Sequence, residues 1–106
     1  NSAAAAGLNE MLLQSHAGVI RVFPAIPKSW DNVSFSTLRA AGAFLVSASR
    51  ENSRTTSITI QSETGVVPVV QCPWTGRMGP LDTSAMSEVM NIARNGDTWI
   101  LTSKKT

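Results

Sequence analysis

The chain has 106 residues, a formal net charge of +2, 42% hydrophobic residues and only 15% charged residues. That length fits a single domain and excludes a complete barrel enzyme or a two-domain oxidoreductase. The nine Lys and Arg residues form no stripe with interleaved aromatic residues, and no apolar run approaches the roughly 20 residues that span a membrane. Nucleic acid and membrane are therefore not expected as partners.

The chain opens with the pattern of an amphipathic helix. A run of alanines follows a serine that can cap a helix, and apolar side chains then recur at helical spacing, at Leu8, Met11 and Leu12. We predict a helix over residues 3–16, ended by Gly18. A free helix of this length is only marginally stable in water, so its apolar face needs a partner surface.

After that glycine the hydrophobic period changes to that of β-strands. Apolar and polar residues alternate in short segments bounded by turn residues. These segments predict strands at residues 19–23, 33–39, 43–50, 57–61 and 66–72. Within them Phe44, Val46, Ile58 and Ile60 are expected to face the core, and Pro68 places the last strand toward a sheet edge.

The C-terminal third contains one clear signal and one ambiguity. Asn95-Gly96 is the strongest hairpin signal in the chain, and it predicts a strand over 98–103 with Trp99 facing the core. Residues 84–94 fit both a helix and a strand. We favour a strand over 87–94, because so short a turn requires an antiparallel partner.

Six or seven short strands at this spacing are typical of a β-sandwich. The sequence assigns no shape to the Gly/Pro-rich loop at residues 73–80. The fold class is therefore expected to be mainly β, an antiparallel β-sandwich with one N-terminal α-helix.

Few residues could carry chemistry. One Cys and one His exclude a Cys-rich or His-based metal site, and no Gly-rich phosphate loop or nucleophile elbow is present, so no metal or cofactor is expected. Cys72 follows apolar valines and is interpreted as buried, and His16 as a helix-terminal residue. The seven acidic residues fall mostly in turns, and the helical Glu10 needs no partner. Solvated carboxylates are therefore favoured over a catalytic pair, and no catalytic residue is assigned.

The three tryptophans have different interpretations. The strand period places Trp99 in the core. Trp30 and Trp74 lie in loops after Pro-containing segments, where packing at the end of the sandwich is only moderately favoured over stacking on a sugar. Trp30 and Trp74 are therefore the residues at which a carbohydrate contact would be expected.

The N-terminal part of the chain resembles a known family. The run NEMLLQSHAGVIRVFPAIPKSW, residues 9–30, is similar to a junction in glycoside hydrolase family 95, which contains α-L-fucosidases and related galactosidases. In that junction a final barrel helix carrying E-M-L-L-Q-S passes into a strand and a P-A-x-P-x-x-W turn. Residues 38–44 resemble the family's L-R-A-R-G-G-F step into a C-terminal β-domain, with Ala41 and Ala43 replacing its second Arg and second Gly. The resemblance is specific over about residues 7–46.

The resemblance implies a piece of a larger glycosidase. In such enzymes the catalytic domain is an (α/α)6 barrel, the proton-donating Glu lies far upstream, and an Asp that helps activate water precedes the E-M-L-L-Q-S helix. Residues 1–6 hold no Asp at that place, so no catalytic residue carries over. We expect residues 1–17 to be the terminal helix of an upstream barrel and residues 18–106 to be a C-terminal β-sandwich accessory domain. The bacterial parent is expected to be secreted or periplasmic.

Three functions follow as hypotheses. The first is structural support of the catalytic barrel, which would then be the partner of this domain. The second is an autonomous carbohydrate-binding module that uses Trp30 or Trp74, and the third is a protein-interaction domain. Without the barrel, Leu8, Met11 and Leu12 are expected to pack on the sandwich or against a second copy as a homodimer.

Overall fold

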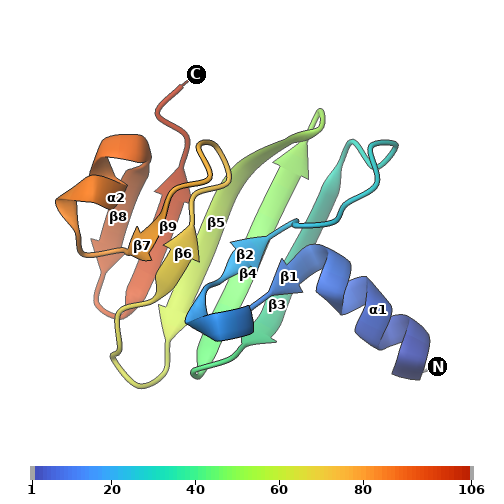
Figure 1. Ribbon diagram of the computed structural model, residues 1–106, viewed down its shortest axis with the longest axis horizontal. Helices are drawn as coiled ribbons and strands as arrows, with labels where there is room; N and C mark the ends of the chain where they lie inside the picture. The colour runs from blue at the N-terminus through green and yellow to red at the C-terminus, as the bar shows by residue number, and fades with distance from the viewer. Residues whose placement is uncertain (1, 106) are drawn as a thin grey trace.

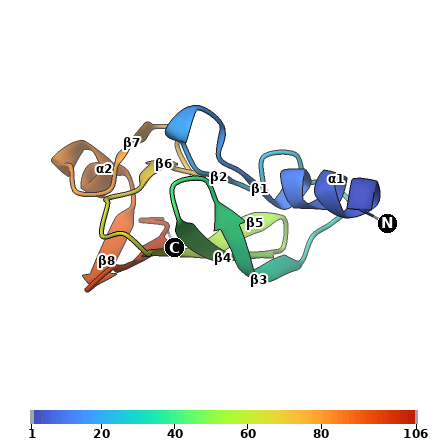
Figure 2. The same ribbon diagram turned by 90° about the horizontal axis from the view of Figure 1, so that it is seen from below.

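Two layers of β-strands enclose the hydrophobic core in a computed structural model, which describes residues 2–105 (Figures 1 and 2). The larger layer is a five-stranded antiparallel sheet, which confirms the predicted β-sandwich class. Its strands, in spatial order, are β3 (Val33–Ala40), β4 (Phe44–Glu51), β5 (Arg54–Ser62), β9 (Thr98–Thr102) and β8 (Asn91–Asn95).

The second layer consists of two short ribbons. The first pairs β1 (Leu13–Gln14) with β2 (Arg21–Val22), and the second pairs β6 (Val69–Gln71) with β7 (Met78–Pro80). Ile20 joins them: its N–H donates to the Val69 carbonyl at 2.9 Å, and its carbonyl accepts from the Gln71 N–H at 3.0 Å. These ribbons therefore act as one layer, which covers one face of the five-stranded sheet (Figure 2).

The strand phases predicted from alternation are confirmed for β4, β5 and β9, whereas in β3 a bulge between Ser36 and Leu38 shifts the phase and leaves Thr37 exposed. Apolar side chains from both layers meet between them, and the rings of Phe23 and Phe35 contact edge to face with centroids 5.6 Å apart. The inward residues of the larger sheet are Phe35, Phe44, Val46, Ala48, Ile58, Ile60, Trp99 and Leu101. The core is therefore built on the face that the period-2 pattern selects.

The N-terminal helix is shorter than the predicted segment 3–16. Helix α1 spans Ser2–Leu12, and the chain then enters β1. Leu13 is buried opposite Val22, and the Phe23 N–H donates to the Leu12 carbonyl at 2.8 Å. Leu13 is not part of the helix because it pairs with β2 instead. Gly18 consequently closes a short 3-10 turn, His16–Gly18, rather than the helix.

Helix α1 lies outside the sandwich. In both views it extends away from the layers, beyond the edge formed by β3 (Figures 1 and 2). Its last residue, Leu12, is 9% exposed and belongs to the core. Leu8, about one helical turn earlier, is 44% exposed. The sandwich therefore covers only the C-terminal end of the apolar face.

The ambiguous segment 84–94 divides into a helix and a strand. Helix α2 spans Ser84–Val89, and β8 begins at Asn91. The strand predicted over 87–94 is therefore wrong in its first half, and the fold has a second helix that was not expected. The helical turn lets both Met86 and Met90 enter the core, where each is fully buried.

The predicted β8–β9 hairpin is confirmed, with its turn one residue later than expected. Asn95 pairs with Thr98, so Gly96 and Asp97 form the turn. Gly96 has φ of +61° and takes the first central position, where type II′ turns place glycine. The loop at residues 73–80, whose shape was unassigned, ends in β7.

Gly42 occupies the tight connection between β3 and β4. Its φ is +93°, and a Cβ at this position would lie 2.9 Å from Cε2 of Phe44. Phe44 is buried and starts β4. Glycine is therefore required where the chain turns closely over an inward phenyl ring.

Candidate functional site

The three tryptophans occupy three different environments. Trp99 is 1% exposed, which confirms its predicted place in the core, and Trp30 is 40% exposed in the loop before β3. Trp74 is half-buried, and its indole Nε1–H donates to the carbonyl of Thr55 at 3.0 Å. That hydrogen bond fixes the indole of Trp74 against the start of β5.

Trp74 forms part of the wall of a cleft of about 360 Å3 at one end of the sandwich. The cleft lies between the β4–β5 hairpin, the segment after β6 and the C-terminal end of the chain. Its lining residues are Arg50, Ser53, Arg54, Thr55, Pro73, Trp74, Ser103 and Lys105. Trp30 does not line it, so the two tryptophans proposed for sugar contact do not form one site.

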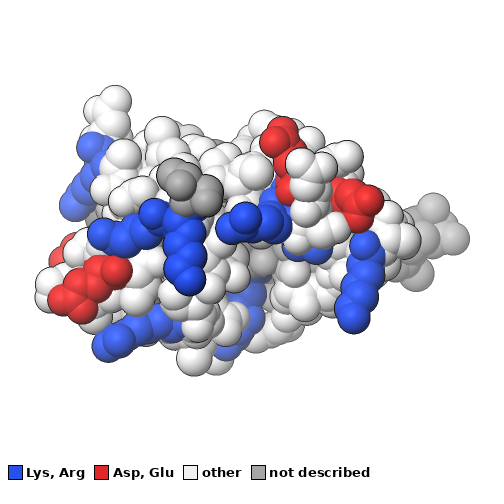
Figure 3. Space-filling view, turned by 90° about the horizontal axis from the view of Figure 1, so that it is seen from above, with Lys and Arg blue, Asp and Glu red and all other residues white. Residues whose placement is uncertain are grey.

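A second cleft of about 420 Å3 adjoins the first. The two share Arg54, Thr55, Ser103 and Lys105 in their walls. Of the carboxylates that the structure describes, that of Glu51 lines the second cleft, and none lines the Trp74 cleft. The surface view of this end shows Lys and Arg side chains gathered over its middle (Figure 3).

The register of the β4–β5 hairpin brings two of these cations together. Arg50 pairs with Thr55, and Glu51 pairs with Arg54, so both arginines lie at the hairpin end. The loop before β3 holds the hairpin tip: the Ser53 hydroxyl donates to Oδ1 of Asp31 at 2.6 Å. The turn between the two arginines is therefore held in place by a hydrogen bond to the loop before β3.

The cations of the Trp74 cleft have no carboxylate partner among residues 2–105. The two ion pairs in that range are His16–Glu10 and Arg39–Glu63, and both lie elsewhere. The hydrogen bond and negative charge of Glu63 raise the pKa of Arg39 above its ordinary value, so Arg39 stays charged at physiological pH. In the Trp74 cleft, by contrast, the buried Nε–H of Arg50 has no hydrogen-bond partner in the described structure.

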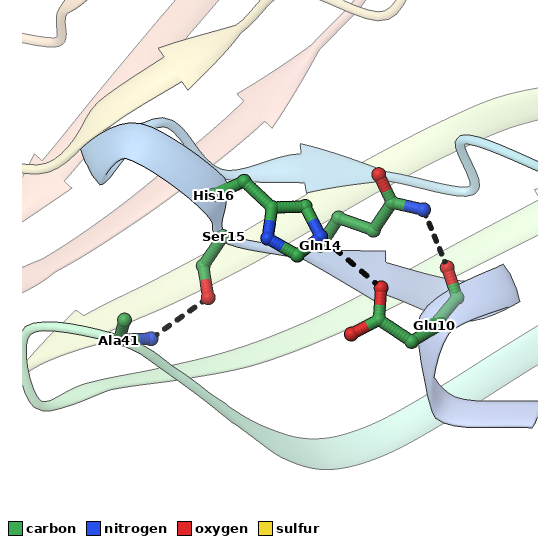
Figure 4. A network of polar contacts seen from close by, with 5 residues as sticks. All are labelled: Glu10, Gln14, Ser15, His16 and Ala41. Carbon is green, nitrogen blue, oxygen red and sulfur yellow. Dashed lines mark hydrogen bonds and ion pairs between the residues drawn. The ribbon is translucent and has the colours of Figure 1, made fainter. Parts of the chain in front are cut away.

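A second group of polar contacts lies at the junction of α1 and the sandwich (Figure 4). His16 lies beyond the helix end, and its Nε2 is 3.3 Å from Oε2 of Glu10. The predictions that His16 ends the helix and that Glu10 has no partner are therefore both wrong. Gln14 donates to the Glu10 carbonyl at 3.1 Å, and Ser15 Oγ accepts from the Ala41 N–H at 3.0 Å. Both side chains are exposed, so their contact adds little stability.

The other groups that could react or bind a metal ion lie as follows. Cys72 is fully buried, as predicted, and its thiol faces the Val89 carbonyl at 3.8 Å. Across the part of the chain that the structure describes, no three His, Cys, Asp or Glu side chains converge in a way that could hold a metal ion. Within the same range no helix has the length and apolarity needed to span a membrane.

Sequence reasoning missed the cations of the Trp74 cleft. They come from a strand end, a strand start and the C-terminal end of the chain, so no local motif contains them. The signal that could have found two of them is the polar turn at residues 51–53, since a hairpin there sets Arg50 and Arg54 near one another.

Comparison with known proteins identifies the family. No curated protein matches the chain. The family model described as "Glycoside hydrolase family 95, C-terminal domain" matches residues 14–104. That range begins at the last residue of β1 and includes every later strand of both layers. The chain therefore belongs to glycoside hydrolase family 95, of which it carries the C-terminal domain.

Proposed function

We propose that this domain is a non-catalytic support for the catalytic domain of its parent enzyme, with α1 as the last helix of that catalytic domain. The observation that carries the proposal is the 44% exposure of Leu8 on a helix that extends beyond the sandwich. The family match begins at residue 14, after α1 has ended. Family membership favours this role over an autonomous carbohydrate-binding module or a protein-interaction domain.

The contacts at the junction suit a rigid attachment. Ser15 accepts a hydrogen bond from the β3–β4 connection, and Gln14 reaches back to the carbonyl of Glu10 in α1 (Figure 4). Leu12 packs into the core directly at the helix end. A helix held in this way transmits its orientation to the sandwich, as a supporting domain requires, and as a flexible linker would not.

The division of the chain follows from this proposal. Under this proposal α1 is the terminal barrel helix, and the accessory sandwich begins with β1 at Leu13, earlier than the boundary after residue 17 that the sequence predicts. The resemblance to family 95 supports a parent that is fucosidase- or galactosidase-like, bacterial, and secreted or periplasmic. A carbohydrate contact at Trp30 would use its 40% exposed indole, and one at Trp74 would use the cleft.

The chain alone should not hydrolyse aryl fucosides or galactosides. Hydrolysis needs an acid and a second carboxylate that flank the glycosidic bond. All seven acidic residues are exposed, and Glu10, Asp31 and Glu63 already contact other side chains. The measurement is release of nitrophenol by highly purified chain over many hours. Turnover that disappears when one of the seven acids is replaced by its amide would contradict the non-catalytic role.

Outside the parent, the exposed face of α1 should drive self-association. Leu8, Met11 and Leu12 form the stripe, and Leu8 contributes the exposed part that a second copy could cover. Sedimentation of the chain should therefore be concentration-dependent, and Leu8→Glu should shift it toward monomer. Asn9→Glu adds the same charge at the neighbouring exposed position and should leave the equilibrium unchanged. Equal sedimentation of both variants and the original chain would exclude a homodimer through this face.

A further inference from the structure

We infer that the Trp74 cleft binds an anionic saccharide, one that carries a carboxylate or a sulfate ester. This inference rests on the cleft and on membership of a glycoside hydrolase family, and not on the supporting role. The cleft has a volume of about 360 Å3, and its lining combines an indole, three cations and three hydroxyl side chains. Each component matches a different part of such a ligand.

The indole provides a surface for a sugar ring. Trp74 is half-buried, and its only polar atom is already bonded to the Thr55 carbonyl at 3.0 Å. The ring is therefore fixed before any ligand arrives, so little conformational freedom is lost on binding. An amphipathic ring held in this way suits the apolar face of a sugar.

The cations select for negative charge. Arg50, Arg54 and Lys105 line the cleft, and no carboxylate of residues 2–105 lines it with them. Among residues 2–105 none of the three forms an ion pair, although Arg39 on the same sheet does so with Glu63. The charge of the cleft is therefore available to a ligand. A guanidinium binds carboxylate and sulfate groups through paired hydrogen bonds.

One donor atom of a residue that lines the cleft lacks an acceptor. The Nε–H of Arg50 is buried without a hydrogen-bond partner in the described structure. Buried polar groups in folded proteins are almost always paired. An oxygen of a bound carboxylate or sulfate would supply the missing acceptor once the guanidinium turns toward the cleft. The hydroxyls of Thr55 and Ser103 line the same cleft and can donate to the hydroxyls of the sugar, while Ser53, whose hydroxyl donates to Asp31, can still accept.

The test titrates the full 106-residue chain with three tetrasaccharides at low ionic strength: tetragalacturonate, a sulfated galactose tetramer and neutral galactotetraose. Nuclear magnetic resonance of the indole N–H groups resolves the three tryptophans, and Trp74→Phe assigns the signal of Trp74. We expect the Trp74 signal to shift with an anionic probe while that of Trp99 stays fixed. Neutral galactotetraose should bind at least about tenfold more weakly, and salt should weaken the anionic binding. The two anionic probes distinguish carboxylate from sulfate.

Matched variants locate the site. Lys105→Ala and Arg54→Gln, both at exposed positions, should each weaken binding by roughly tenfold, as the loss of a charge-assisted hydrogen bond does. Lys104→Ala and Arg77→Gln remove neighbouring exposed charges that line neither cleft, and these should change affinity by less than about twofold. Unchanged amide spectra verify the fold of each variant.

Three results would overturn the inference. The first is no shift of the Trp74 signal at 10 mM of either anionic probe, a ceiling at which about 1 mM affinity is still measurable. The second is equal binding of the neutral and the anionic probes. The third is an equal loss from Lys104→Ala and Lys105→Ala, which would mean attraction by the net charge of this end and not by the cleft.

Discussion

Replacement of Trp99 by alanine should lower the free energy of unfolding by about 3–5 kcal/mol, the range for deletion of a buried aromatic side chain. Trp99 is 1% exposed and lies between Ile60 on β5 and Arg94 on β8, its register partners. The guanidinium of Arg94 stands 4.5 Å from the ring centroid, so the variant loses this contact as well. Denaturant melts followed by far-ultraviolet circular dichroism measure the change.

The adjacent residue supplies the control. Ile100 lies on the same strand but is 44% exposed on the opposite face of the sheet. Ile100→Ala should therefore cost less than about 1 kcal/mol, because little apolar area is returned to water. Similar losses from the two variants would mean that the outer face of this sheet is covered and that the assignment of the core face is incomplete.

Ile60→Ala should cost about 2–5 kcal/mol, the usual range for a large aliphatic side chain in a core. Ile60 is fully buried in β5, between Val46 of β4 and Trp99 of β9. The measurement is again a denaturant melt, with Thr59→Ala, on the other face of β5, as the control. A loss below about 0.5 kcal/mol for Ile60→Ala would show that the cavity collapses or that the strand phase is wrong.

Features that depend on the local sequence pattern, such as which residues of a strand face inward, could be predicted from the sequence. Alternation identifies the inward residues of β4 and β5, because one face of β4 is buried from Phe44 to Ala48 and one face of β5 from Ile58 to Ser62. Gly96 identifies the β8–β9 hairpin, because its positive φ is a local demand of the turn. In both cases the residues that decide the structure are neighbours in the chain.

Boundaries that depend on distant residues could not be predicted. The helical spacing continues past Leu12, but Leu13 leaves the helix because Val22 pairs with it. In segment 84–94 the same apolar residues satisfy either period, and burial of both Met86 and Met90 decides for a helix. Tertiary contacts of this kind override local preference, and a single sequence does not reveal them.

The site could be predicted only in part. The loop positions of Trp30 and Trp74 favour packing only moderately over a sugar contact and do not separate the two residues, whereas in the structure only Trp74 lines the cleft. The cations beside Trp74 come from segments that are distant in sequence, and only the fold assembles them. The sequence does not show that Arg50 and Arg54 line the same cleft, because their proximity depends on the register of β4 with β5.

The most direct test of the supporting role compares one substitution in two proteins. In the isolated chain Leu8 is 44% exposed, so Leu8→Glu should change the stability of the monomer by less than about 0.5 kcal/mol. If α1 is the last helix of the catalytic domain, Leu8 is buried in the parent enzyme. There Leu8→Glu introduces an uncompensated buried charge, which costs about 3–5 kcal/mol.

The measurement is therefore the free energy of unfolding of the catalytic domain in the full parent, with and without Leu8→Glu, beside Asn9→Glu as the matched control. We expect Leu8→Glu to destabilise the parent by several kcal/mol and to lower its glycosidase activity after mild heating, while Asn9→Glu has little effect on either. Equal behaviour of the two variants in the parent, or unfolding of the isolated chain by Leu8→Glu, would contradict the assignment of α1 to the catalytic domain.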